Sequence, residues 1–166
     1  MGSGVKGVYG KAGTKSSSKT SPSAMHKGVT SWAVRTKEKL TGGPKKKFNT
    51  ACVVVDAETG KPYYGRNRGI LEEGAPKNPA LFGDDKTPGL LPSVNQESFP
   101  IGNCAEVDAV NKALDAGAKL ENLHMMTIHV TKSGFGKQKP ACKNCTKTFE
   151  GKIAVNHSGW TAGEED

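Results

Sequence analysis

The sequence has few large apolar residues and no long hydrophobic run. Leu, Ile, Val and Phe account for 29 of its 166 residues, about 17%, which is below the roughly 20% at which disorder becomes a serious interpretation. Most of them lie between Phe48 and Asn156, so a small core is expected there. No stretch of about 18 apolar residues exists, which excludes a membrane-spanning helix. The first residues also lack the apolar segment of a secretory signal peptide.

Cysteine and arginine are scarce as well. Four cysteines (Cys52, Cys104, Cys142 and Cys145) are too few for a disulfide scaffold, and clustered thiols in a chain of this size indicate a metal or redox site. Only three of the 24 basic residues are arginines, and the formal net charge is +8. Such a basic surface favours polyanions, although a solvated lysine-rich surface explains the charge equally well.

Composition divides the chain into three parts. Residues 1–24 are rich in Gly, Ser, Lys and Thr, which predicts a flexible linker of the kind expected when a domain is cut from a longer protein. Their first four residues, Met-Gly-Ser-Gly, are typical of an expression remnant. Residues 25–160 are expected to form the folded domain, and residues 161–166 form an acidic tail.

The spacing of apolar residues predicts an α/β fold. Helices are expected over residues 26–40, over 101–117 and from 142 onward, and strands over 50–56, 62–67, 123–131 and 152–156. The first two strands are joined by a turn and form a hairpin. Residues 71–99 contain four prolines and no sustained period, which indicates one long loop of the kind that is usually functional. A second flexible loop is predicted over residues 133–139.

Three thiols are placed where helices are expected to begin. Cys142 and Cys145 form a Cys-x-x-Cys pair at one helix start, and Cys104 stands at the start of the preceding helix. Helix N-termini favour thiolates, because free amides and the helix dipole stabilise negative charge. Three thiolates around zinc leave a fourth position open, which is the arrangement of a catalytic site. Glu106 can reach a water at that position and act as a proton shuttle.

The residues alone leave other interpretations open. A Cys-x-x-Cys pair that opens a helix is also typical of a thioredoxin-like redox site. A closed structural zinc site needs a fourth ligand, for which His124, His129, His157 and Cys52 are available. Cys52 lies inside a predicted strand and is better explained as a small core residue. Glu106 taken alone is a helix-start residue that favours the dipole.

The joint pattern Cys104-x-Glu106…Pro140-x-Cys142-x-x-Cys145 resembles the zinc deaminase signature His/Cys-x-Glu…Pro-Cys-x-x-Cys. The stretch Asn103-Cys-Ala-Glu-Val-Asp-Ala-Val-Asn-Lys-Ala-Leu114 is similar to the YwqJ-like group of bacterial deaminase toxins in the cytidine deaminase superfamily, especially to its single-stranded DNA cytosine deaminases. The resemblance covers roughly residues 48–156. Two departures are the cysteine at position 104, where histidine is commoner, and the extra residue Ala141 before Cys142.

The resemblance implies a three-layer α/β/α cytidine-deaminase fold with a mixed sheet and an N-terminal β-hairpin. It implies one zinc ion held by Cys104, Cys142 and Cys145, with Glu106 as the catalytic residue that moves the proton of a zinc-bound water while cytosine is hydrolysed to uracil. Substrate contacts are expected from residues near the hairpin end and the second helix start, namely Arg66, Asn67, Arg68, Asn103 and Ala105.

The resemblance also implies partners and a location. The expected substrate is single-stranded DNA, with RNA as an alternative; a deaminase of free nucleosides or nucleotides and a non-enzymatic zinc or redox module are the competing functions. The chain is expected to be a monomeric domain of a secreted effector, delivered into the cytoplasm of target bacteria as a mutagenic toxin. A cognate immunity protein is then required, and the positive charge favours an acidic one.

Overall fold

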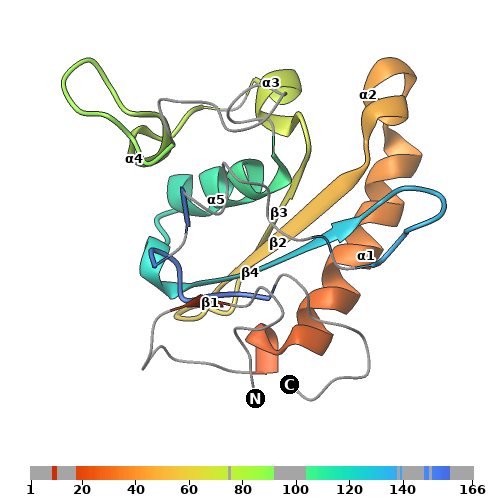
Figure 1. The fold of residues 1–166 in the computed structure, drawn as a ribbon, viewed down its shortest axis with the longest axis horizontal. Coiled ribbons are helices and arrows are strands. Elements are labelled where there is room, and N and C mark those ends of the chain that lie inside the picture. Colours follow the sequence, from red (N-terminus) through yellow and green to blue (C-terminus); the bar gives the residue numbers. More distant parts are fainter. Residues whose placement is uncertain are drawn as a thin grey trace.

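The computed structural model describes residues 9–10, 18–74, 76–91, 104–137, 139, 148–149 and 151–157 (Figure 1). The helices in these segments are η2 (Ser18–Thr20), α1 (Pro22–Lys39), α2 (Gly42–Lys47), α3 (Gly69–Glu73), α4 (Pro79–Phe82), α5 (Ala105–Asp115) and η3 (Leu120–Asn122). The strands are β1 (Tyr9–Gly10), β2 (Thr50–Asp56), β3 (Pro62–Arg66), β4 (Leu123–His129) and β5 (Val155–Asn156).

The strands form one mixed sheet in the order β1-β5-β4-β2-β3. β2 lies between β3 and β4 and is antiparallel to both, whereas β5 is parallel to β4. β2 and β3 are the predicted hairpin, closed by a turn in which Gly60 has a φ of +77° and donates its N–H to the Asp56 carbonyl. The predicted mixed α/β architecture with an early β-hairpin is therefore confirmed.

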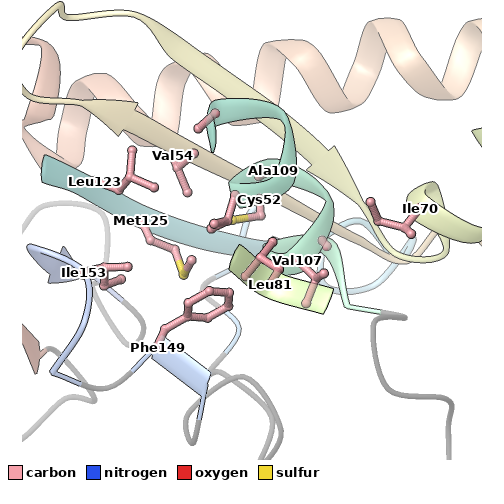
Figure 2. Close-up of a cluster of buried hydrophobic side chains, with 13 residues drawn as sticks. Cys52, Val54, Ile70, Leu81, Val107, Ala109, Leu123, Met125, Phe149 and Ile153 are labelled. Atoms are coloured by element: carbon pink, nitrogen blue, oxygen red, sulfur yellow. The ribbon is translucent and has the colours of Figure 1, made fainter. Parts of the chain in front are cut away.

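Two apolar clusters cover the two faces of the sheet. Alternate residues of a strand point to opposite faces, so Cys52 and Val54 face α5 while Val53 and Val55 face α1. Figure 2 shows the cluster on the α5 side, where Phe149, Leu81 and Ile153 complete the packing. Helices on both faces explain why all seven residues of β2 are buried. Cys52 is fully buried here, as predicted for a core residue.

The region predicted as one loop over 71–99 contains helical turns in its described part. α3 ends inside it, and α4 begins where the Asn78 side chain accepts the N–H of Ala80 and Pro79 occupies the first turn. Leu81 is completely buried and anchors α4 to the core. The single-loop prediction is thus wrong for residues 79–82, because a capped proline turn with one anchoring side chain is sufficient to fix them. Residues 92–99 lie outside the described segments.

Three elements begin within residues 1–24, where composition predicts a linker. Tyr9 and Gly10 of β1 pair with β5, η2 follows at Ser18, and α1 starts at Pro22. Ser21 caps α1 by accepting the N–H of Ala24. Of the helix predicted from residue 142, only Thr148 and Phe149 are described, and both are helical. The predicted tail at 161–166 lies outside the described residues.

Candidate active site

The amino terminus of α5 carries the described part of the predicted constellation. Cys104 is the N-cap residue, with an extended backbone (φ −71°, ψ 148°), and its carbonyl accepts the N–H groups of Val107 and Asp108. Its side chain is partly exposed. The thiol therefore belongs to the N-cap residue of α5, and a helix N-terminus is an environment that stabilises a thiolate.

Glu106 lies in the first turn of α5 and is buried, with 4% of its surface exposed. Its Oε2 accepts a hydrogen bond of 3.1 Å from the Thr127 hydroxyl on β4. Thr127 is the cross-strand neighbour of Cys52 on β2, so all three side chains lie between α5 and the sheet. Burial raises the pKa of the Cys52 thiol, and the Glu106 carboxylate raises it further. Cys52 is therefore a buried, protonated thiol of the core.

Two glycines let α5 approach the hairpin closely. A Cβ on Gly65 of β3 would lie 2.5 Å from the Ala105 carbonyl oxygen and closer still to the Ala109 nitrogen. A Cβ on Gly69 would collide with the Asp108 carboxylate. Because both contacts are with the first two turns of α5, they fix the position of the segment that carries Cys104 and Glu106.

Asp108 ties the same helix to the end of β3. It is fully buried, its Oδ2 accepts the backbone N–H of Arg66 at 3.0 Å, and Lys112 lies 3.5 Å from the same oxygen. Burial raises the pKa of Asp108, and the Lys112 ammonium partly offsets this. Sequence reasoning did not identify Asp108 or Gly65. The one signal that could have identified Asp108 is an acidic residue on the otherwise apolar side of the predicted helix.

Asn67 holds the start of β2 in place. Its Oδ1 accepts the backbone N–H groups of Asn49 and Thr50, and its Nδ2 donates to the Lys47 carbonyl at 2.7 Å. The side chain is buried, with 7% exposed. These three hydrogen bonds give Asn67 a structural role, and its contact with substrate stays a prediction.

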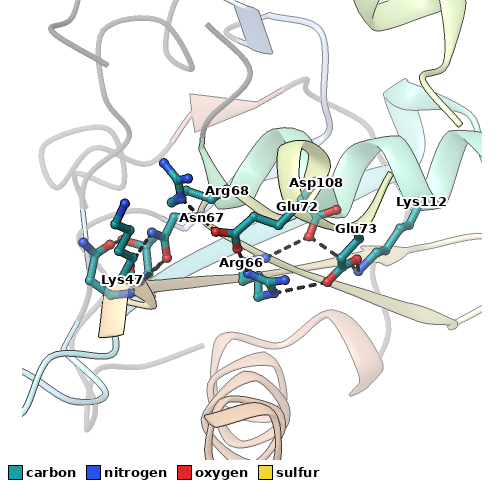
Figure 3. Close-up of polar contacts among 10 residues, drawn as sticks. Lys47, Arg66, Asn67, Arg68, Glu72, Glu73, Asp108 and Lys112 are labelled. Carbon is teal, nitrogen blue, oxygen red and sulfur yellow. Dashed lines mark hydrogen bonds and ion pairs between the residues drawn. The ribbon is translucent and has the colours of Figure 1, made fainter. Parts of the chain in front are cut away.

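Arg66 and Arg68 are engaged with the carboxylates of α3 (Figure 3). Arg66 is the cross-strand neighbour of Ala51, so both side chains lie on the α1 side of the sheet. The Arg66 guanidinium pairs with Glu72 and Glu73. Arg68 pairs with Glu72 at 2.9 Å and keeps 34% of its side chain exposed. Burial raises the pKa of Glu72, but the two arginines outweigh it and hold that pKa below its ordinary value. Of the two arginines, only Arg68 keeps substantial surface for a ligand.

The remaining predicted site residues divide between described and undescribed segments. Ala105 is fully buried at the start of α5. Asn103, Cys142 and Cys145 lie outside the described residues. The described residues contain no group of three side chains able to hold a metal. Cys104 fits a zinc-binding role as a partly exposed thiol at a helix start, and a complete thiolate set requires the two other cysteines.

The histidines considered for a closed zinc site are spread over the sheet. His124 lies near the start of β4, and its neighbour Met125 belongs to the α5 cluster. Because adjacent strand residues point to opposite faces, the His124 side chain points to the α1 face. Its ring centroid is 6.2 Å from that of His157. His129 lies at the other end of β4, opposite Thr50. The structure therefore does not bring these three histidines together.

No family model, curated protein or solved structure matches the chain. Among the helices in the described segments, none combines the length and the apolar character needed to cross a membrane.

Proposed function

We propose that the chain is a zinc-dependent deaminase that converts cytosine to uracil in nucleic acid, chiefly in single-stranded DNA. The observation that carries this proposal is the first turn of α5. There, a partly exposed thiol and a buried carboxylate stand two residues apart, and the carboxylate is held by a threonine of the central sheet. A carboxylate that served only the helix dipole would be expected at the surface.

In this proposal Cys104, Cys142 and Cys145 hold the zinc ion, which lowers the pKa of a water molecule when it is bound. Glu106 accepts a proton from the attacking water and delivers it to the ring nitrogen N3 of cytosine. The water oxygen bonds to C4, and its second proton passes through Glu106 to the amino group. The C4–N bond then breaks, ammonia leaves, and the C4 oxygen becomes the carbonyl of uracil. Thr127 orients the carboxylate, and the close contact of Gly65 with α5 keeps it in place relative to the sheet.

Cytosine deamination harms the cell that makes the enzyme, so we place the domain in a secreted interbacterial toxin that acts in the cytoplasm of target bacteria and is neutralised by an immunity protein in the producer. The net charge of +8 supports both a polyanionic substrate and an acidic immunity protein.

The test is uracil formation in a single-stranded oligonucleotide with one cytosine, read by cleavage with uracil glycosylase, alongside metal analysis. The change Glu106→Gln is expected to lower turnover by about 10²- to 10⁴-fold while zinc content and fold are kept, because only the proton carrier is lost. Glu121→Gln, at an exposed carboxylate in η3, is the matched control and keeps full activity. Cys104→Ser is expected to lose zinc and activity together. A folded, zinc-loaded wild type that makes no uracil contradicts the proposal.

A further inference from the structure

The chain after β4 folds back along that strand and forms a fixed loop over residues 131–137. His129 donates its N–H to the Lys137 carbonyl at 2.8 Å, and the Gly136 N–H donates to the His129 carbonyl at 2.9 Å. Further along, the Lys139 N–H donates to the Thr127 carbonyl at 3.0 Å. The His26 ring on α1 contacts the Gly136 carbonyl at 2.7 Å. The loop is therefore held at its base by β4 and from the side by α1.

An exposed aromatic ring stands on this loop between lysines. Phe135 has 41% of its surface exposed, although large apolar side chains usually gain from burial. Two other large apolar side chains in the described segments, Val34 on α1 and Leu71 on α3, are similarly exposed, but neither belongs to the loop. Lys132 and Lys137 are exposed on either side of Phe135. An aromatic ring flanked by cations is the combination that binds unpaired nucleic-acid bases together with their phosphates.

The positive charge of this region has no carboxylate partner among the described residues. Lys132, Lys137 and Lys139 make no ion pair with a carboxylate in the part of the chain that the structure describes. The Lys139 ammonium instead donates to the Thr50 hydroxyl at 2.6 Å. Burial lowers the pKa of His129, and the charges of Lys139 and Lys137 lower it further. These lysines therefore create a positive potential at the end of the sheet.

Lys139, which follows the loop, bonds the same strand residue as the proposed catalytic carboxylate. The Thr127 carbonyl accepts the backbone N–H of Lys139 and the Thr127 hydroxyl donates to Glu106, so Thr127 contacts both residues. His129 lies two residues further along β4 and so points to the same face as Thr127. The exposed lysines of α2 add positive charge at this end of the sheet. α2 is held there because the Asn67 side chain bonds both the Lys47 carbonyl and the N–H of Thr50, the first residue of β2. Figure 1 shows α2 and the 131–137 loop at the same end of the molecule.

We propose that the 131–137 loop, with Lys139, binds the nucleic-acid strand next to the target cytosine, Phe135 stacking on a base while Lys132, Lys137 and Lys139 contact phosphates. This inference rests on the proposed function and names the surface that would hold the single strand. A base can stack on an exposed ring only where it is not already stacked on both sides, which excludes the interior of a duplex. An acidic protein would use the lysines but would not need the ring.

The experiment measures binding rather than catalysis. A fluorescent 20-residue oligothymidylate contains no cytosine, and its anisotropy reports binding to the full chain. Phe135→Ala is expected to weaken binding by about 5- to 150-fold, which corresponds to the loss of one base–aromatic stack. Leu71→Ala removes an equally exposed apolar side chain on α3 and is expected to bind like the wild type. When the strand is annealed to oligoadenylate, Phe135→Ala and the wild type should bind alike.

A second pair of variants tests the charges. Lys137→Glu is expected to weaken binding and to reduce its dependence on salt, because fewer counterions are released from the strand. Lys61→Glu changes the charge equally in the β2–β3 turn, at the opposite end of the sheet, and should have the smaller effect. If Phe135→Ala, shown to be folded by circular dichroism, binds oligothymidylate like the wild type, the proposal is wrong. If in addition Lys137→Glu alone weakens binding, the surface serves a polyanion without bases, such as an acidic protein.

The two proposals fail separately. Uracil formation that is unchanged by Phe135→Ala refutes the loop as a substrate surface and leaves the deaminase intact. Oligothymidylate binding that depends on Phe135, without any uracil formation by zinc-loaded protein, refutes the deaminase and leaves a single-strand binding surface.

Discussion

The substitution Gly65→Ala tests the contact that positions the candidate active site. The added Cβ would lie 2.5 Å from the Ala105 carbonyl oxygen and 2.9 Å from the Asp108 Cβ. Ordinary contacts begin near 3.4 Å, so β3 and α5 must separate by about 1 Å. Both neighbours are backbone or sit next to it, and no flexible side chain can move aside to make room.

The cost of that separation follows from two terms. Forcing an extra methyl group into a packed core costs about 1–3 kcal/mol. Moving α5 also stretches the hydrogen bond from the Arg66 N–H to Asp108, a bond to a charged group that contributes about 1.5–3 kcal/mol and is only partly lost. We therefore expect the free energy of unfolding to fall by about 2–4 kcal/mol. For a chain of this size the melting temperature falls by roughly 2–4 °C per kcal/mol.

Urea unfolding followed by circular dichroism measures this change. Gly43→Ala is the matched control, because its Cβ meets nothing within 4 Å beyond its chain neighbours, although Pro44 disfavours a helical alanine before it. That variant should lose much less stability than Gly65→Ala. A value for Gly65→Ala within about 0.5 kcal/mol of the wild type, with an unchanged urea dependence, would refute the close approach of α5 and β3.

Two further predictions concern pH. Glu72→Gln is expected to cost about 1–2 kcal/mol at pH 7, because it removes the charge paired with Arg66 and Arg68. The pKa of Glu72 is lowered in the folded state, so this stabilisation is complete above its ordinary value of 4.5 and is lost as the pH falls through the folded-state pKa. Stability curves of variant and wild type should converge in acid, and curves that stay parallel would contradict the assignment. Burial and the charges of Lys139 and Lys137 lower the pKa of His129 in the folded state. A bound polyanion acts in the opposite direction, because negative charge favours the protonated ring. Oligothymidylate binding should therefore strengthen as the pH falls from about 7.5 to 5.5, and His129→Gln should flatten this dependence; an identical profile in the variant would exclude His129 as its source.

The sequence predicted the elements that have a strong local pattern. The valine run at 53–55 and the turn that follows are enough to specify the hairpin, and the alanine spacing of α5 predicted its extent within a few residues. α4 was missed because a four-residue helix is too short to show a period. Its position depends on one buried leucine and one asparagine cap.

The candidate site was predictable in part for the same reason. Cys104 and Glu106 stand where a helix start was expected, and this placement is confirmed, whereas their chemical roles stay predictions. The contacts that hold them could not be derived, since Asp108 receives an N–H from a residue 42 positions away. Likewise, Asn67 looks like an ordinary turn residue until its bonds to Lys47, Asn49 and Thr50 are seen. Such pairings depend on the tertiary fold and leave no periodic signal in the sequence.

The central place of β2 in the sheet has a consequence for how the chain folds. Its partner β3 is separated from it by a short turn, but its other partner, β4, lies about 70 residues further along the chain. Closing a loop of that length costs roughly 4 kcal/mol of chain entropy, so the hairpin can nucleate early while the β2–β4 ladder must await the collapse of α5. During that interval an apolar strand presents an unpaired edge, at which two incompletely folded molecules can join. Refolding yield should accordingly fall as protein concentration rises, even though the native sheet buries that strand completely.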